Sequence, residues 1–92
     1  MAKKVENEKK FLVIEMTIQE AVACLGCFGE CNLCGDSVES GYYVAVIDQF
    51  YCETCYRAFI GGASRYRSDI GTERQRYIRV RRKLEDLETW EE

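Results

Sequence analysis

The chain has 92 residues, a formal net charge of −3, six cysteines and no histidine. A chain of this length has a small core, and it contains no apolar run near the ~18 residues that span a membrane. Because no apolar signal core follows the first residues, we expect a cytoplasmic protein whose cysteines are metal ligands or free thiols rather than disulfides.

The N-terminal part is predicted to contain a tail, a strand and a helix. Residues 1–10 alternate lysine with glutamate and are predicted to form a flexible tail, which leaves residues 11–92 as a single domain. Residues 11–16 are rich in aromatic and β-branched side chains, which is typical of a strand. Thr17 and Glu20 fit the capping box of a helix that ends at Gly26. The apolar stripe of this helix is predicted to be Ile18, Ala21, Val22 and Leu25.

Two C-x-x-C pairs follow, Cys31 with Cys34 and Cys52 with Cys55. Seventeen residues separate them. Four thiolates in two such pairs can surround one zinc ion as a tetrahedron, with Zn–S bonds of about 2.3 Å. A redox dithiol would explain one pair but not both at this spacing. The sequence therefore predicts one structural zinc per chain.

The elements between and after the two pairs suggest a fold. Gly35 lets the chain turn back after the first pair, and residues 42–47 and 50–51 are predicted to be two strands joined at residues 48–49. Residues 56–60 follow the second pair without a helix breaker, up to Gly61 and Gly62, so the second pair should lie at a helix start. This order predicts an α+β treble-clef zinc finger, with its core in residues 31–60.

Residues 31–60 also resemble the second zinc finger of LIM domains, in which a C-x-x-C pair precedes a hairpin and an aromatic-Cys-x-x-Cys-Tyr segment. Here that segment is Tyr-Cys-Glu-Thr-Cys-Tyr at residues 51–56. The chain is also similar to small LIM-like zinc proteins of bacterial phages and mobile elements. The resemblance implies zinc binding without catalysis, and LIM fingers bind other proteins. The chain departs from LIM domains because it has one finger and no histidine ligand.

Cys24 and Cys27 form a third C-x-x-C pair. With Cys31 and Cys34 they could hold a metal locally, as a second or exchanging site, and an exposed pair could be redox-sensitive. Alternatively, both are spare thiols, since a free cysteine beside a helix stripe behaves as a small apolar residue. Both interpretations stay open at this point.

The C-terminal part is predicted to be a loop over residues 63–71 and a helix over residues 72–90, with Thr72 as the N-cap. Its apolar residues Tyr77, Val80, Leu84 and Leu87 repeat with a seven-residue period. The stripe either packs against the finger of the same chain or forms a short coiled-coil seam with a second copy. We therefore expect a monomer or a weak homodimer.

Residues 65–83 contain eight basic and two acidic residues. Guanidinium groups pair well with phosphate oxygens, whereas arginines of a solvated helix can also pair with acids one turn away. The candidate partner-binding residues are Arg65, Arg67, Arg74, Arg76, Arg79 and Arg82.

The sequence predicts a protein without catalytic activity. It lacks histidine, the usual acid–base group near neutral pH, and four thiolates leave no open position on the zinc. We expect a zinc-stabilised protein-interaction module, acting as an adaptor or as an inhibitor of a host factor, with no membrane or small-molecule substrate. The alternative is a nucleic-acid-binding accessory or regulatory protein that acts through residues 65–83.

Overall fold

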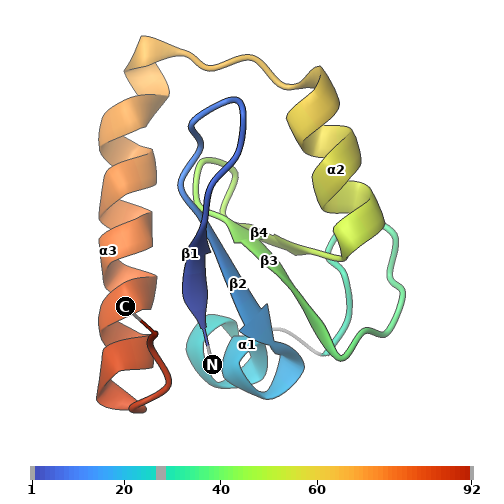
Figure 1. Cartoon of the computed structure of the whole chain (residues 1–92), viewed down its shortest axis with the longest axis vertical. Coiled ribbons are helices and arrows are strands. Elements are labelled where there is room, and N and C mark those ends of the chain that lie inside the picture. Colours follow the sequence, from blue (N-terminus) through green and yellow to red (C-terminus); the bar gives the residue numbers. More distant parts are fainter. Residues whose placement is uncertain (1, 27–28, 92) are drawn as a thin grey trace.

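The computed structural model describes residues 2–26 and 29–91. The elements in this part of the chain are β1 (Lys3–Val5), β2 (Val13–Thr17), α1 (Ile18–Leu25), β3 (Ser40–Val44), β4 (Gln49–Tyr51), α2 (Glu53–Gly62), the 3-10 helix η1 (Arg67–Asp69) and α3 (Ile70–Asp86). The strands form one antiparallel sheet in the order β1-β2-β3-β4 (Figure 1). The predicted α+β class is confirmed.

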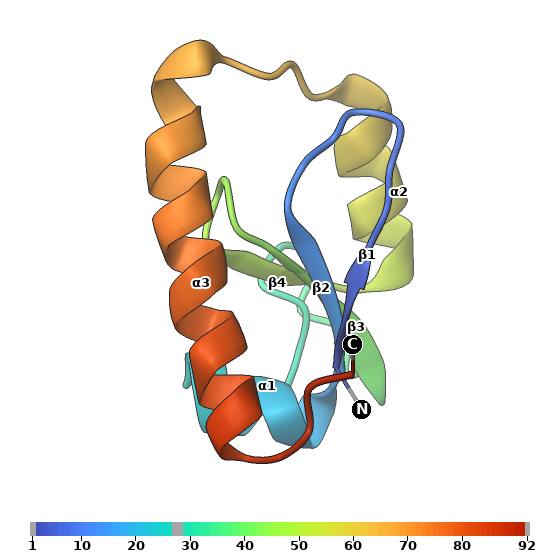
Figure 2. The ribbon, with the colours of Figure 1, turned by 60° about the vertical axis from the view of Figure 1, so that its left-hand side comes forward.

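Helices cover both faces of this sheet, with α3 and α2 on opposite sides of it (Figures 1 and 2). Because strand side chains alternate between the two faces, Ile14 and Tyr43 pack with α1 and α3, whereas Val13 and Val44 pack with α2. The first core consists of Ala2, Ile14, Met16, Ala21, Cys24, Tyr43, Ala45, Phe50, Tyr77, Val80 and Leu84. The second core consists of Phe11, Val13, Cys31, Val44, Tyr51, Cys52, Cys55, Tyr56 and Ile60. Three of the four predicted ligands therefore belong to the second core.

The predicted flexible tail is wrong for residues 2–10. Lys3–Val5 form the edge strand β1, whose Lys3 lies opposite Glu15 of β2. Ala2 is buried, its N–H donates to the Thr89 carbonyl, and its carbonyl accepts from the Glu91 N–H, each at 2.7 Å. These are main-chain bonds to a distant segment, which local charge alternation does not reveal.

The turn between β1 and β2 depends on Asn7. Its side-chain oxygen accepts hydrogen bonds from the N–H groups of Lys9 and Phe11, at 3.2 and 3.0 Å. Asparagine often closes such turns by bonding the backbone two residues on. The turn places Phe11 in the second core although β2 itself starts only at Val13, two residues later than predicted.

Helix α1 has the predicted caps and keeps three of its four predicted stripe residues, because Ala21 is buried in the first core and Ile18 and Leu25 pack against it. Thr17 and Glu20 form the capping box, and Gly26 ends the helix with a φ of 69°. The buried side carries Ala21 and Cys24, whereas Val22 is 47% exposed. Because Val22 directly follows Ala21, its side chain points about 100° away from that of Ala21 around the helix axis.

The β3–β4 hairpin has a longer turn than predicted, because β3 ends at Val44 and β4 starts at Gln49. The turn is held by the Tyr43 hydroxyl, which donates to Asp48 at 2.6 Å. Gly41 is required in β3, since a Cβ there would lie 2.6 Å from the Tyr51 carbonyl oxygen and 2.7 Å from the Phe50 ring.

Helix α3 is shifted from its prediction of residues 72–90. It begins at Ile70 after η1 and ends at Asp86, and Thr72 is not its N-cap. Leu84 is fully buried in the first core with Tyr77 and Val80, so these residues pack within their own chain as one of the two interpretations predicted. Leu87 lies beyond the helix and is 49% exposed, which removes it from the predicted stripe.

A buried carboxylate anchors the start of α3 to the sheet. Glu73 is 2% exposed and accepts a hydrogen bond from the Leu12 N–H at 2.9 Å. Its other oxygen lies 3.3 Å from the Arg65 guanidinium, which also donates to the Lys10 carbonyl. The charge of Glu73 is thus paired and hydrogen-bonded, as a buried charge requires.

Candidate metal centre

The first pair of cysteines lies in a tight turn. The Cys31 carbonyl accepts a hydrogen bond from the Gly35 N–H at 3.0 Å, and the Cys31 N–H donates to the Asp36 backbone carbonyl at 2.9 Å. Gly35 has a φ of +78°, a conformation that glycine adopts at little cost. The Leu33 N–H points at the Cys31 sulfur, 3.4 Å away. We call residues 31–35 the knuckle.

Strand β4 holds the knuckle in place. The Asn32 N–H donates to the Phe50 carbonyl at 2.8 Å, and the Phe50 N–H donates to the Asn32 side-chain oxygen at 2.6 Å. These two bonds pair the carbonyl and the N–H of Phe50 with Asn32, and they place the knuckle beside the end of β4. Cys52 follows two residues after Phe50, so the same contacts align the two cysteine pairs.

The second pair occupies the start of α2. Cys52 is the N-cap residue, its side chain makes no capping hydrogen bond, and Cys55 lies in the first turn. The free N–H groups and the positive dipole end of a helix start favour thiolates there. Helix α2 begins three residues earlier than predicted and includes both Gly61 and Gly62. Both glycines therefore belong to the last turn of the helix, which ends at Gly62.

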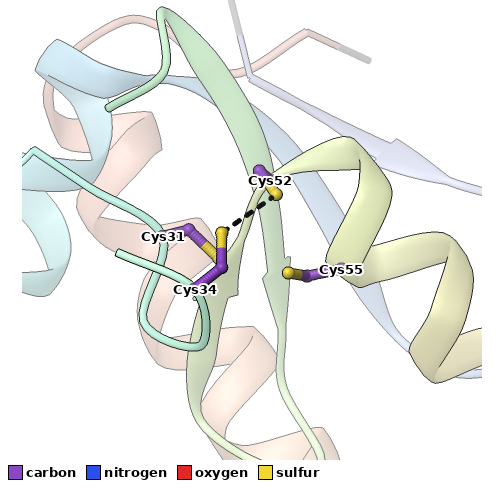
Figure 3. A group of neighbouring side chains, drawn as sticks. All are labelled: Cys31, Cys34, Cys52 and Cys55. Carbon is purple, nitrogen blue, oxygen red and sulfur yellow. Dashed lines mark hydrogen bonds between the residues drawn. The ribbon is translucent and has the colours of Figure 1, made fainter. Parts of the chain in front are cut away.

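The four sulfur atoms of Cys31, Cys34, Cys52 and Cys55 lie within 4.8 Å of one another (Figure 3). Cys34 Sγ and Cys52 Sγ are 3.7 Å apart. Four sulfurs at about 2.3 Å from a central zinc would lie about 3.8 Å apart. The cluster therefore has the dimensions of a tetrahedral thiolate site and could hold a metal ion.

Burial and electrostatics differ among the four thiols. Cys34 is exposed, whereas the other three are buried in the second core. Burial opposes the Cys31 thiolate, but hydrogen bonds from the N–H groups of Cys34, Cys52 and Leu33 outweigh it and lower the Cys31 pKa to about 6. Burial and the neighbouring sulfurs raise the pKa of Cys55. Without a bound cation, a thiolate is thus favoured at Cys31 and disfavoured at Cys55. A bound divalent ion would favour the thiolate form of the other cysteines as well.

Aromatic rings surround this centre. Tyr42 and Tyr56 stack with ring centroids 4.3 Å apart, and the rings of Phe11 and Phe59 lie 5.2 Å apart. Because these rings pack around α2, they keep the helix start close to the sheet. The cysteine cluster is therefore part of a packed core and not an appendage on the surface.

Cys24 does not belong to the cluster. It is 5% exposed in the first core, and burial raises its pKa. This agrees with the interpretation of Cys24 as a small apolar residue. Cys27 lies outside the described residues.

The six candidate arginines do not form one surface. Arg65 pairs with Glu73 and lies 5.2 Å from the centre of the Phe11 ring. Arg76 donates to the carbonyls of Ala45 and Val46 at 3.3 and 3.0 Å. Arg79 lies 3.9 Å from Asp48. Among the described residues, the side chains of the remaining three make no hydrogen bond or ion pair within the chain. Those remaining three are Arg67, Arg74 and Arg82.

Asn32 and Glu73 were missed by sequence reasoning. An asparagine between two ligand cysteines was a local signal for the Asn32 contact, because asparagine side chains often bond nearby backbone. The Glu73 contact is between residues 61 positions apart and left no signal in the local sequence.

Comparisons with known proteins find no match: no family model, no curated protein and no solved structure resembles this chain. The resemblance to LIM fingers and phage proteins thus gains no support beyond the cysteine cluster. No helix among residues 2–26 and 29–91 is long and apolar enough to cross a membrane.

Proposed function

We propose that this chain is a zinc-stabilised, non-catalytic protein-interaction module with a treble-clef arrangement of knuckle, hairpin and helix. One observation carries the proposal: four cysteine sulfurs from two separate segments meet within 4.8 Å, and three of these cysteines belong to a hydrophobic core. An adaptor, or an inhibitor of another cytoplasmic protein, would use such a module.

Zinc fits this ligand set better than other ions. Four thiolates in tetrahedral geometry are typical of structural zinc or of an iron–sulfur centre. The chain carries no histidine, so sulfur would fill all four positions, as in closed structural sites. Such a centre adds a charge of −2, which the Leu33 N–H and the start of α2 would partly offset.

Zinc would stabilise this domain because it would join the knuckle directly to the start of α2. The knuckle contacts β4 through two hydrogen bonds at Asn32, and α2 approaches the sheet through the second core. Structural zinc can contribute on the order of 10 kcal/mol to folding, which is comparable with the whole stability of a small domain.

A closed four-sulfur site leaves no position for water or a substrate on the metal. The role of the module would then be binding, and its resemblance to LIM fingers favours a protein as the partner. Nucleic-acid binding through residues 65–83 is less favoured, because these arginines do not form one surface: Arg65 pairs with Glu73, whereas Arg76 lies against the β3–β4 turn. A cytoplasmic location, where thiols stay reduced, suits the site.

Metal analysis of the purified protein tests the zinc part of the proposal. We expect a zinc-to-protein ratio near one, and Cys52→Ser should lose the metal. Cys24→Ala is the matched control, since it also removes a thiol but one outside the cluster, and it should keep the zinc. A folded, metal-free wild type, or iron absorbance, contradicts the proposal.

A further inference from the structure

Helix α3 carries a basic surface on the side turned away from the sheet. The helix stands at one edge of the molecule, with the sheet on its inner side (Figures 1 and 2). A shallow, open groove of about 630 Å³, lined by residues of α3 alone, runs along its outer side. We call this surface the α3 basic face, and we define it by Gln75, Arg76, Ile78, Arg79, Arg82 and Lys83.

The charge of this face is opposite to that of the rest of the molecule. Its four basic residues, together with Asp86 at the same groove, have a formal charge of +3. Because the whole chain carries −3, the residues outside this groove sum to −6. A surface of one sign on a molecule of the other sign steers oppositely charged partners to one place.

Neutral contacts hold two of the cations in position without cancelling their charge. Arg76 donates to two backbone carbonyls of the β3–β4 turn, and Lys83 donates to the Cys24 carbonyl at 3.2 Å. Arg79 lies 3.9 Å from Asp48, but both side chains are about half exposed, so water screens this pair strongly. Two of the four cations of the face are thus held in place before any partner arrives, which lowers the entropic cost of binding for that part of the face.

An apolar side chain lies at the edge of these cations. Ile78 is 37% exposed at the same groove. Protein interfaces combine arginine with apolar contacts, whereas a phosphate backbone offers little for isoleucine to contact. From residue 72 to residue 86 the groove follows the helix for about 20 Å, which is enough for a peptide of three to four helical turns.

Polyanions fit the face less well than a short acidic peptide. The basic face is followed at once by acidic residues, among them Glu85 and Glu88. Screening acts over about 8 Å at physiological salt, so a peptide confined to the groove would meet mainly its positive charge. A nucleic acid extends further and would bring its phosphates, about 1.7 Å apart along a duplex axis, close to those acids.

We propose that the α3 basic face binds an acidic peptide segment of a partner protein, with carboxylates on Arg79 and Arg82 and an apolar residue on Ile78. This inference rests on the proposed function as a protein-interaction module, and it specifies the surface and the chemistry of the partner.

Fluorescence anisotropy with zinc-loaded full-length protein tests the inference. The probes are a labelled peptide of glutamates with interspersed leucines, the same peptide with serine for leucine, and DNA and RNA oligonucleotides of equal formal charge. The double variant Arg79→Gln/Arg82→Gln removes two charges from the face. The control Arg57→Gln/Arg67→Gln removes the same charge from α2 and from η1, both outside the α3 basic face.

We expect the leucine-containing peptide to bind most tightly, and to lose about tenfold or more in affinity with Arg79→Gln/Arg82→Gln. The control should change the affinity by less than about twofold, because it preserves the face. Ile78→Ser should remove the preference for leucine over serine.

Three results would overturn the inference: no binding of either peptide, equal losses in both double variants, or tighter binding of an oligonucleotide that depends on Arg79 and Arg82. The last would make the face a nucleic-acid site. Zinc content is measured in every sample. If the zinc-loaded protein does not bind the peptide, only this inference is contradicted. If the protein is folded but contains no zinc, the proposed function is contradicted.

Discussion

The two faces of the sheet are stabilised in different ways. On the α1 and α3 side, the first core encloses large apolar side chains such as Leu84 and Tyr43 and contains none of the clustered cysteines. On the α2 side, three of the clustered cysteines are themselves core residues. Apolar burial stabilises both sides, and on the second side a metal bound by the clustered thiols would add to it. The difference indicates that a small domain can divide its stability between packing and a metal.

Metal removal should separate the two sides most strongly. Chelation should cost the second core up to about 10 kcal/mol, so amide hydrogen exchange should rise in α2 and the knuckle. Exchange in α1 and α3 should rise less, because the first core contains none of the proposed ligands. Equal and simultaneous loss of protection in α2 and α3 would show that the two cores are one cooperative unit.

The first core can be weakened without touching the metal. Leu84→Ala removes a fully buried side chain and should reduce the free energy of unfolding by about 2–5 kcal/mol. Zinc content should stay near one per chain. Denaturant unfolding and metal analysis of the same sample check both statements. A normal melting curve combined with loss of dimerisation would instead indicate a coiled-coil seam.

The knuckle contact should matter mainly for the metal. Asn32→Ala removes the acceptor of the Phe50 N–H and loosens the knuckle from β4. By analogy with groups that orient metal ligands, the zinc affinity should fall about 10- to 100-fold, as measured by competition with a coloured chelator. Asn7→Ala is a suitable control, since Asn7 closes a turn that contains none of the clustered cysteines. An unchanged zinc affinity of Asn32→Ala would mean that the cysteines need no alignment by β4.

The smallest effect is expected at an exposed ion pair. Arg57 and Glu53 lie 2.7 Å apart on α2, with side chains 75% and 60% exposed. Because such pairs contribute about 0–1 kcal/mol, Arg57→Gln should hardly shift the thermal midpoint. A loss comparable with that of Leu84→Ala would show that the surface of α2 is more tightly coupled to the metal side than its exposure implies.

Local sequence signals predicted the parts of the structure that depend on neighbouring residues. The capping box at Thr17 and Glu20, the end of α1 at Gly26 and the grouping of the four cysteines follow from residue type and spacing. Contacts between distant segments were not predictable in this way. Strand β1 depends on main-chain pairing with β2 and on Ala2, and Glu73 depends on Leu12.

The same limit applies to the arrangement of the arginines. In the sequence, residues 65–83 look like one basic surface. In the structure, Arg65 turns toward the β1–β2 loop and Arg76 toward the β3–β4 turn. At about 100° per residue, Arg74 points about 140° away from Arg79 and about 80° away from Arg82 around α3. Tertiary contacts decide which basic side chains remain available to a partner, so the sequence alone could not identify them.

X-ray absorption at the zinc edge of the protein as purified is the most direct test of the central claim. The account predicts four sulfur neighbours at about 2.3 Å, with no nitrogen or oxygen in the first shell. A mixed shell of sulfur and oxygen would contradict it, because it would mean an open position and thus a site that can take water or substrate.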